Sequence, residues 1–274
     1  MVKEWKSRRK KAAKFISDHI SIDIEAGIIL GSGLGDLCDD IEDEVVIPFT
    51  DIPYFPQSTV KGHSGELVIG KKHGKNLLLM NGRVHFYEGY SMKEIAFPIW
   101  VMKEIGIKNL LITNAAGGLN KTFRPGDIMI ITDHLNFMGT NPLIGSNDQE
   151  IGPRFPAMTE AHPREMIALA EKSAAELNLH VMKGVYVAIT GPVYETTAMS
   201  KFQRLIGGDA VGMSTVPELI AATHAGMNNL AISCITDIVR DNPGDALTHE
   251  EVIAVAKKTR PKFIKFMKQI IKNI

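Results

Sequence analysis

The sequence predicts an α/β fold around a mixed, largely parallel β-sheet. Short apolar stretches alternate along the chain with longer segments of helical periodicity, a pattern typical of parallel strands joined by helices. Two apolar stretches, 67–70 and 76–80, are separated only by the polar segment 71–75, so they predict a hairpin and an antiparallel pair. No repeat, linker or shift in composition interrupts the 274 residues, and we therefore expect a single domain over 1–274.

The N-terminal elements follow from local patterns. Trp5, Phe15 and Ile16 recur among lysines and predict an amphipathic helix over 4–18. The apolar stretch 26–30 predicts a strand that runs into the glycine-rich turn 31–35. The hairpin comes next, and it is followed by a predicted helix over 92–105.

The rest of the chain continues the alternation. Further strands are predicted over 109–113, 127–132, 185–190 and 229–235. Further helices are predicted over 162–177, 196–206, 218–225 and 249–272. The segment 138–163 is long and rich in glycine and proline, and loops of this length are usually functional or disordered.

Composition excludes several classes of function. Lys+Arg and Asp+Glu both number 31, so no net charge attracts nucleic acid or an anionic membrane. Cys38 and Cys234 form neither a disulfide framework nor zinc-ligand spacing. The basic segment 1–14 is not followed by an apolar signal core, and no apolar run approaches the roughly 18 residues of a spanning helix. We expect a cytoplasmic protein without a nucleic-acid or membrane partner.

Polar side chains follow the carboxyl ends of the predicted strands. They are Ser32, Arg83, His85, Asn114, His134, Glu195 and Asp237. In α/β folds ligands bind beyond these strand ends, so the set is the first indication of a site.

The segment 82–90, GRVHFYEGY, is the most specific of these patterns. In an extended chain Arg83, His85 and Tyr87 alternate onto one face. The arginine fork matches phosphate oxygens, the imidazole adds a donor, and Glu88 could orient that ring. The alternative is a set of solvated charges beside a turn.

Other segments are weaker alone. GSGLG at 31–35 could bind an anion or form a plain turn, and it matches neither a dinucleotide fingerprint nor a P-loop. The loop around His63 is more typical of a turn. Tyr194 and Glu195 are suited to stacking on a base and bonding its edge. In 211–218 a hydroxyl could bind phosphate, while Met213 alone is more typical of a core residue.

Taken together, seven segments resemble the trimeric family of purine nucleoside phosphorylases. They are GSGLG (31–35), GHSG (62–65), GRVHFYEGY (82–90), NAAGGLN (114–120), GPRFPAM (152–158), GPVYET (191–196) and VGMSTVPE (211–218). The match extends from Gly31 to about Glu251. The resemblance implies a three-layer phosphorylase/hydrolase-like fold, in which helices flank a central mixed β-sheet, and a homotrimer with active sites near subunit interfaces.

The resemblance also implies an activity and a set of residues. Phosphate would cleave purine (2′-deoxy)ribonucleosides to the free base and (2′-deoxy)ribose 1-phosphate, without a metal or organic cofactor. The implied phosphate-binding residues are Ser32, His63, Arg83, His85, the amide of Ala115, and Ser214. The implied nucleoside-binding residues are Tyr87, Ala116, Phe155, Tyr194, Glu195, Val211, Met213, Asp237 and His249. The implied catalytic residues are His85, Glu88, Glu195 and Asp237. Phe155 would reach the active site of a neighbouring subunit.

The chemistry of these residues suits the reaction. Cleavage of the glycosidic C–N bond creates an oxocarbenium-like ribose and an anionic purine. Phosphate clamped on one face stabilises the cation and then captures it at C1′ with inversion, while Glu195 holds the Watson–Crick edge of the base. Oriented charges of this kind supply several kcal/mol of transition-state stabilisation.

Asp237 departs from the family pattern. Relatives selective for 6-oxopurines typically place asparagine here, whose amide donates a hydrogen bond. An ionised aspartate only accepts, which suits the 6-amino group of adenine, whereas a protonated one could donate to N7. We therefore expect adenosine to be a substrate beside inosine and guanosine, although Glu195 usually accompanies guanine and hypoxanthine.

Other classes stay open. A 5′-methylthioadenosine phosphorylase is favoured by Asp237, but Glu195 and a polar His249 near the 5′ position argue against it. A non-catalytic nucleoside- or phosphate-binding protein would be indicated by loss of the phosphate residues, and Arg83 is among those present. A nucleotide kinase is disfavoured because the P-loop lysine is missing.

Overall fold

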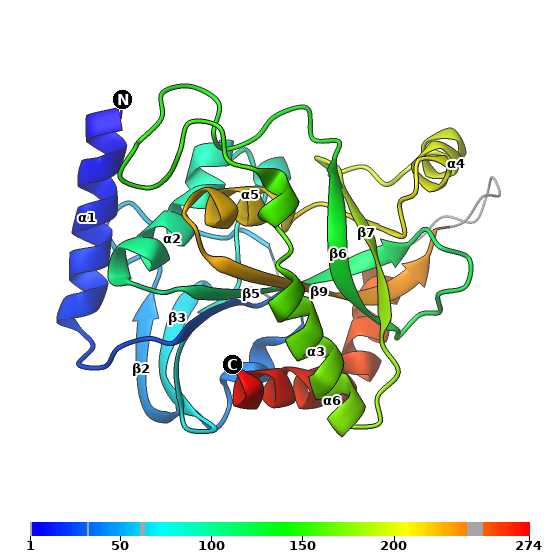
Figure 1. The fold of residues 1–274 in the computed structure, drawn as a ribbon, viewed down its shortest axis with the longest axis horizontal. Helices are drawn as coiled ribbons and strands as arrows, with labels where there is room; N and C mark the ends of the chain where they lie inside the picture. Colours follow the sequence, from blue (N-terminus) through cyan, green and yellow to red (C-terminus); the bar gives the residue numbers. More distant parts are fainter. Residues whose placement is uncertain (1, 32, 61–63, 240–248) are drawn as a thin grey trace.

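The nine-stranded sheet and its flanking helices are shown in Figure 1. The computed structural model describes residues 2–31, 33–60, 64–239 and 249–274. The strands are β1 Ala26–Ile29, β2 Glu42–Pro48, β3 Glu66–Lys72, β4 Lys75–Asn81, β5 Asn109–Gly118, β6 Ile128–Asn136, β7 Met182–Ala188, β8 Ala210–Gly212 and β9 Asn228–Ile238. The helices are α1 Val2–Asp18, α2 Met92–Ile105, α3 Arg164–Glu176, α4 Thr197–Leu205, α5 Val216–His224 and α6 His249–Asn273.

The sheet combines parallel and antiparallel pairs in the order β2-β3-β4-β1-β5-β8-β7-β6-β9. Strand β1 is parallel to β4 and β5, whereas β3 and β4 form the predicted antiparallel hairpin. Strand β5 also pairs with β9, so β5, β8, β7, β6 and β9 form a closed ring of paired strands. The predicted α/β class with a mixed sheet is confirmed.

Helices cover both faces of the central strands. Along β4, Leu77 and Leu79 pack in the core cluster that contains α3 and α6, while Leu78 and Met80 pack in the cluster that contains α1, α2 and α5. This alternation is the period of a strand, and burial on both faces explains why these strands read as continuous apolar runs.

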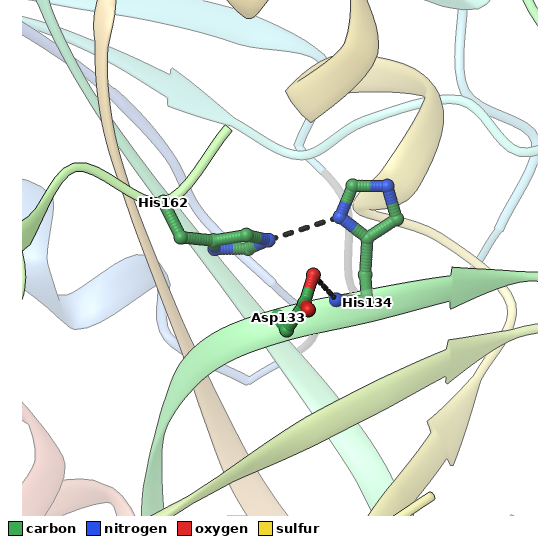
Figure 2. Close-up of side chains that lie close together, drawn as sticks. All are labelled: Asp133, His134 and His162. Carbon is green, nitrogen blue, oxygen red and sulfur yellow. Dashed lines mark hydrogen bonds between the residues drawn. The ribbon is translucent and has the colours of Figure 1, made fainter. Parts of the chain in front are cut away.

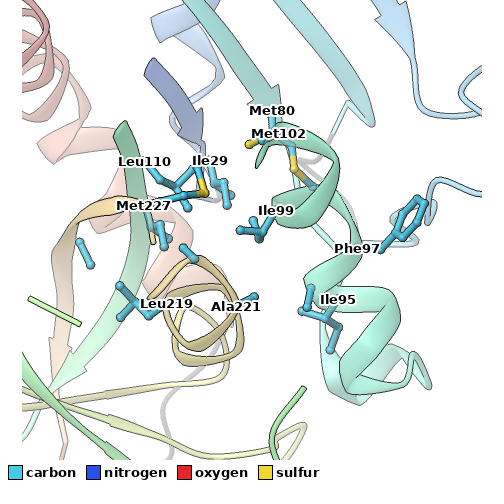
Figure 3. Close-up of a cluster of buried hydrophobic side chains, with 14 of the residues drawn as sticks. Ile29, Met80, Ile95, Phe97, Ile99, Met102, Leu110, Leu219, Ala221 and Met227 are labelled. Carbon is cyan, nitrogen blue, oxygen red and sulfur yellow. The ribbon is translucent and has the colours of Figure 1, made fainter. Parts of the chain in front are cut away.

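Figure 3 shows the second of these clusters, in which side chains of α2 and α5 converge on β1 and β5. Ile99 and Leu219 approach the sheet from the two helices, and Ile29 and Leu110 meet them from the strands. None of the helices in the described ranges is both long and apolar enough to cross a membrane.

Several strands differ from the sequence prediction. The strand predicted over 109–113 is longer in the structure, because residues 114–118 also pair with β9 as far as Gly118. The carboxyl end of β9 likewise includes Asp237. Strand β2, a mostly exposed strand rich in charge, and the three-residue β8 were not predicted. Their pairing comes from neighbouring strands, which local propensity does not report.

Candidate active site

The predicted site residues that the structure describes lie mainly at the carboxyl ends of β4, β5 and β9 and in the turns beside them. Arg83 follows β4, Ala115 and Ala116 lie in β5, Asp237 lies in β9, and Ser214 follows β8. The parallel pairing of β1 with β4 and β5, and of β5 with β9, brings these ends to one edge of the sheet.

Arg83 is buried, with only 2% of its surface exposed. Its Nη2 donates to the carbonyl of Thr113, and its Nη1 lies 3.4 Å from both Thr215 Oγ1 and Glu218 Oε1. Burial lowers the pKa of Arg83, and the Glu218 carboxylate opposes that effect. A buried charge needs such a partner, so Glu218 holds the guanidinium in place in its charged form.

His85 is fixed by Glu88. The carboxylate Oε1 lies 2.9 Å from His85 Nδ1 and also accepts a hydrogen bond of 2.7 Å from the His85 amide. Its Oε2 accepts bonds from the amide and hydroxyl of Thr59, both at 2.7 Å. Burial raises the pKa of Glu88, but the bonds from His85 and Thr59 outweigh it and bring the pKa down to about 2. An ionised Glu88 therefore keeps a proton on Nδ1 and sets the ring's orientation.

Tyr87 lies against the same imidazole. The rings of His85 and Tyr87 are stacked, with centroids 4.8 Å apart and an interplanar angle of 13°. Burial, and then the charge of Glu88, raise the pKa of Tyr87 to about 12. The phenol is therefore neutral. Tyr87 also lies beside Gly191, in one of the segments predicted to hold the nucleoside.

Thr215 joins the turn after β8 to the phosphate side of the site. Its backbone has φ +74° and ψ −49°, and the Val216 amide bonds the Ser214 carbonyl at 2.8 Å. This is a γ-turn with positive φ, a strained conformation. The Thr215 hydroxyl accepts from Asn114 Nδ2 at 2.9 Å and lies 3.1 Å from Ser214 Oγ.

Thr215 and Glu218 were missed by sequence reasoning. Both lie in the VGMSTVPE segment, but their role depends on Arg83, which is 132 residues from Thr215 in the chain. The only sequence signal is a glutamate in the first turn of a helix that is otherwise apolar as far as Ala222.

Gly191 brings the 191–196 segment against Tyr87 and Met213. It has φ +64°, and a Cβ at this position would lie 3.1 Å from Met213 Cγ and 3.2 Å from Tyr87 Cδ1. Only glycine accepts both the backbone conformation and this close approach. Tyr87 and Met213, two residues that the resemblance assigns to the nucleoside, thus lie close to the same glycine.

Glu195 and Asp237 provide two carboxylates on the predicted base side. Burial raises the pKa of Glu195, and the negative charge of Asp237 raises it further. Asp237 Oδ1 accepts from Thr236 Oγ1 at 3.0 Å. Its carboxylate lies over Gly117, where a Cβ would be 3.3 Å from Oδ2. Val211, which is buried, lies in the adjoining strand β8.

The remaining predicted residues fall into two groups. Tyr194 and Phe155 are on the surface, with 45% and 87% of their areas exposed. The guanidinium of Arg154 lies 5.4 Å from the centre of the Phe155 ring. Ser32 and His63, and the side chain of His249 at the start of α6, lie outside the described part of the structure.

Comparison with known proteins gives the family. The family model for the phosphorylase superfamily matches residues 25–272. The chain is 52% identical to purine nucleoside phosphorylase 1 of Bacillus subtilis, over 97% of this chain and 98% of that one. It is 40% identical to the purine nucleoside phosphorylase of Rattus norvegicus, over 97% and 94% of the two chains.

Solved structures agree. A Schistosoma mansoni purine nucleoside phosphorylase in complex with adenosine superposes with a TM-score of 0.92 and is 41% identical, over 97% of this chain and 96% of that one. A Schistosoma mansoni purine nucleoside phosphorylase in complex with inosine also has a TM-score of 0.92, at 42% identity over 98% of this chain and 96% of that one. With the family model matched over nearly the whole chain and relatives this similar, the chain belongs to the purine nucleoside phosphorylase family of the phosphorylase superfamily.

Proposed function

We propose that the chain catalyses the reversible phosphorolysis of purine (2′-deoxy)ribonucleosides to a free purine and (2′-deoxy)ribose 1-phosphate. The observation that carries the proposal is a continuous set of contacts from the arginine to the nucleoside segments. Arg83 and Ser214 meet through Thr215, and His85 stacks on Tyr87, which contacts the turn at Gly191. These contacts support a site in which the residues assigned to phosphate adjoin those assigned to the nucleoside.

Each side has its own task in this reaction. Arg83, His85 and Ser214 would hold phosphate below C1′, where its negative charge stabilises the ribose cation as the C–N bond breaks. A phosphate oxygen then forms the new bond to C1′, and the electron pair of the broken bond leaves with the purine. The family resemblance assigns no metal or cofactor to these steps, so we expect activity to survive treatment with EDTA.

The base side supports acceptance of both 6-oxo- and 6-aminopurines. An ionised Glu195 accepts from the N1–H of hypoxanthine or guanine. A protonated Glu195 can instead donate to the bare N1 of adenine, while Asp237 accepts from the 6-amino group. Because its pKa is raised by burial and then by Asp237, Glu195 is protonated more often than an exposed glutamate. We infer that adenosine is cleaved in addition to inosine and guanosine.

The test is release of base from inosine, guanosine, adenosine and 5′-methylthioadenosine, each with and without phosphate. We expect phosphate-dependent cleavage of the first three. Base release that does not require phosphate would overturn the phosphorylase assignment. If adenosine is inert, only the inference drawn from Asp237 fails and the phosphorylase assignment stands. A preference for methylthioadenosine would instead indicate a 5′-methylthioadenosine phosphorylase.

We also propose a homotrimer in which Phe155 enters the active site of a neighbouring subunit. The ring is 87% exposed in the single chain, which leaves it available to a neighbouring subunit, and aromatic side chains contribute strongly to interfaces when they are buried there. Size-exclusion chromatography with light scattering tests the assembly, and a monomeric mass would contradict it.

A further inference from the structure

Asp133, His134 and His162 come together at the carboxyl-terminal part of β6. Figure 2 shows their side chains on one side of the strand, directed at one another. His134 Nδ1 lies 2.9 Å from His162 Nε2. One ligand atom from each of the three residues lies within 4.8 Å of the others. None of the three belongs to the phosphate and nucleoside residues described above.

A β-bulge lies directly before Asp133. The pairing of β6 with β7 shifts register between Ile131 and Asp133. Bulges re-aim side chains and are common next to functional sites. The irregular part of the strand therefore adjoins the Asp133–His134 pair.

The burial of the three residues suits a shared ligand site. His134 and His162 are half-buried, whereas Asp133 is exposed. The two rings are close enough to share one ligand, since His134 Nδ1 and His162 Nε2 already lie within hydrogen-bonding distance.

We propose that Asp133, His134 and His162 bind a divalent transition-metal ion of the zinc type. Two imidazole nitrogens and one carboxylate oxygen form a recognised three-residue ligand set, with water in the fourth position. Two nitrogens bound to one tetrahedral zinc ion at about 2.05 Å lie about 3.3 Å apart, so the rings need to separate only slightly. Asp133 is exposed, which leaves the ion a path from solvent.

The ion would have a structural role. His162 closes the long 138–163 segment immediately before α3, whereas Asp133 and His134 belong to the sheet. A shared metal therefore fastens the end of this segment, which also contains Phe155, to β6. The site does not depend on the proposed reaction. The cysteine count argued only against cysteine-based zinc sites. The two histidines are 28 residues apart in the sequence, so no short spacing pattern indicated this site.

The test is calorimetric titration of the full-length, chelator-treated protein with ZnCl2 and, separately, with MgCl2. We expect one zinc ion per chain and no magnesium binding, because nitrogen ligands select zinc. His162→Gln should weaken zinc binding by at least about 100-fold, since loss of a group that only orients a metal ligand already costs 10- to 100-fold. The matched control is His180→Gln, a change at an exposed histidine, which should leave the affinity unchanged.

Cobalt(II) gives an independent readout. Bound in the same site it should show the visible absorption of a four-coordinate ion, and Asp133→Asn should alter that spectrum. Circular dichroism and the Tm of each metal-free variant establish that it is folded. The proposal is overturned if the wild-type protein binds no stoichiometric zinc, or if folded His162→Gln binds it as His180→Gln does. In that outcome the histidines form a simple hydrogen-bonded pair, whether or not the enzyme is a phosphorylase.

Discussion

At the residue scale, Glu88 is a carboxylate that orders a neighbouring imidazole. It accepts from both the amide and the ring of His85. Glu94 makes a similar capping box at the start of α2, where it accepts from the amide and hydroxyl of Ser91. The two glutamates thus share a local structural task, but only the first contacts a residue assigned to phosphate.

We predict that Glu88→Gln lowers kcat/KM for phosphate by roughly 10- to 100-fold, because a hydrogen bond to a charged group is worth about 1.5–3 kcal/mol. Glu94→Gln is the matched control and should change the same constant less than about 2-fold. Steady-state kinetics at varied phosphate measures both. Equal losses in the two variants would mean that capping, and not His85, accounts for the effect.

The same carboxylate makes a pH-dependent contribution to stability. Its pKa is lowered from 4.5 to about 2 by the balance of burial and hydrogen bonds. Its stabilising effect is therefore fully present above pH 4.5 and is lost as the pH falls toward 2. We predict that the difference in unfolding free energy between wild type and Glu88→Gln shrinks across that window. Urea unfolding at a series of pH values measures it, and a constant difference would contradict the assignment.

Under the proposed function, base preference is expected to depend on the charge of Glu195. Its pKa is raised by burial and then by Asp237, so lowering the pH increases the protonated form that suits adenine. We predict that the adenosine-to-inosine ratio of kcat/KM rises as the pH falls. Asp237→Asn removes the like charge, so it should lower the pKa of Glu195 and move the acid limb for inosine to lower pH.

The Asp237→Asn variant should also lose adenosine activity by about 10-fold or more, since one lost recognition bond costs about 1–3 kcal/mol. Parallel pH profiles with both nucleosides measure the two effects. Asp209→Asn is unsuitable as a control because Asp209 accepts structural bonds. Asp51→Asn, at an exposed aspartate, serves instead. An unchanged ratio at all pH values would exclude this role for Glu195.

At the scale of elements, the turn between β8 and α5 connects the sheet to the phosphate residues. Thr215 holds a positive φ that a β-branched residue rarely adopts, and its hydroxyl contacts Arg83, Asn114 and Ser214. Strain of this kind persists where surrounding contacts over-determine it. The contacts of Thr215 with these side chains therefore hold the turn in place, and the turn positions the same side chains.

We predict that Thr215→Val raises KM for phosphate about 10-fold and lowers the free energy of unfolding by about 1–3 kcal/mol, because buried donors lose their acceptor. Thr215→Ser keeps the hydroxyl and should restore both values to near those of the wild type. Phosphate kinetics and urea unfolding give the two readouts. If the serine variant behaves as the valine variant does, backbone strain rather than the hydroxyl controls the site.

Elements that depend on local contacts were predictable from the sequence, whereas elements that depend on distant contacts were not. The helix expected over 92–105 is α2, with both ends as predicted, because its periodicity and its cap are local. Residues 114–118 lack β-propensity, and their pairing with β9 is a tertiary contact. Among the site residues, Arg83 and His85 were predicted from one short segment. Thr215 was not, because it acts through partners far away in the sequence.

At the scale of the whole molecule, the two sides of the site rest on different parts of the sheet. Arg83 follows β4, one of the central strands covered on both faces by helices. The base side rests on the closed ring, with Ala116 in β5, Val211 in β8 and Asp237 in β9. Strand β5 belongs to both parts, so it fixes the phosphate side relative to the nucleoside side.

In the proposed homotrimer, Phe155 of a neighbouring subunit would be added to each site. Complementation between two variants tests this. If Phe155 serves the neighbouring site, Phe155→Ala damages a different site from the one in its own chain. We predict that Phe155→Ala and Glu195→Gln are each impaired by at least about 10-fold, as expected for loss of aromatic packing or of a charged hydrogen bond. Each variant should still fold and assemble as the wild type does.

Co-expression of the two variants should then restore activity. In a cyclic trimer assembled at random from equal amounts, about one quarter of the sites combine an intact Phe155 from one chain with an intact Glu195 from the next. The specific activity should therefore reach roughly one quarter of the wild-type value. If Phe155 acts within its own chain, every site contains one damaged residue and the mixture shows only the average of its parents. Light scattering on the same sample separates a trimer from a dimer, which would complement equally well.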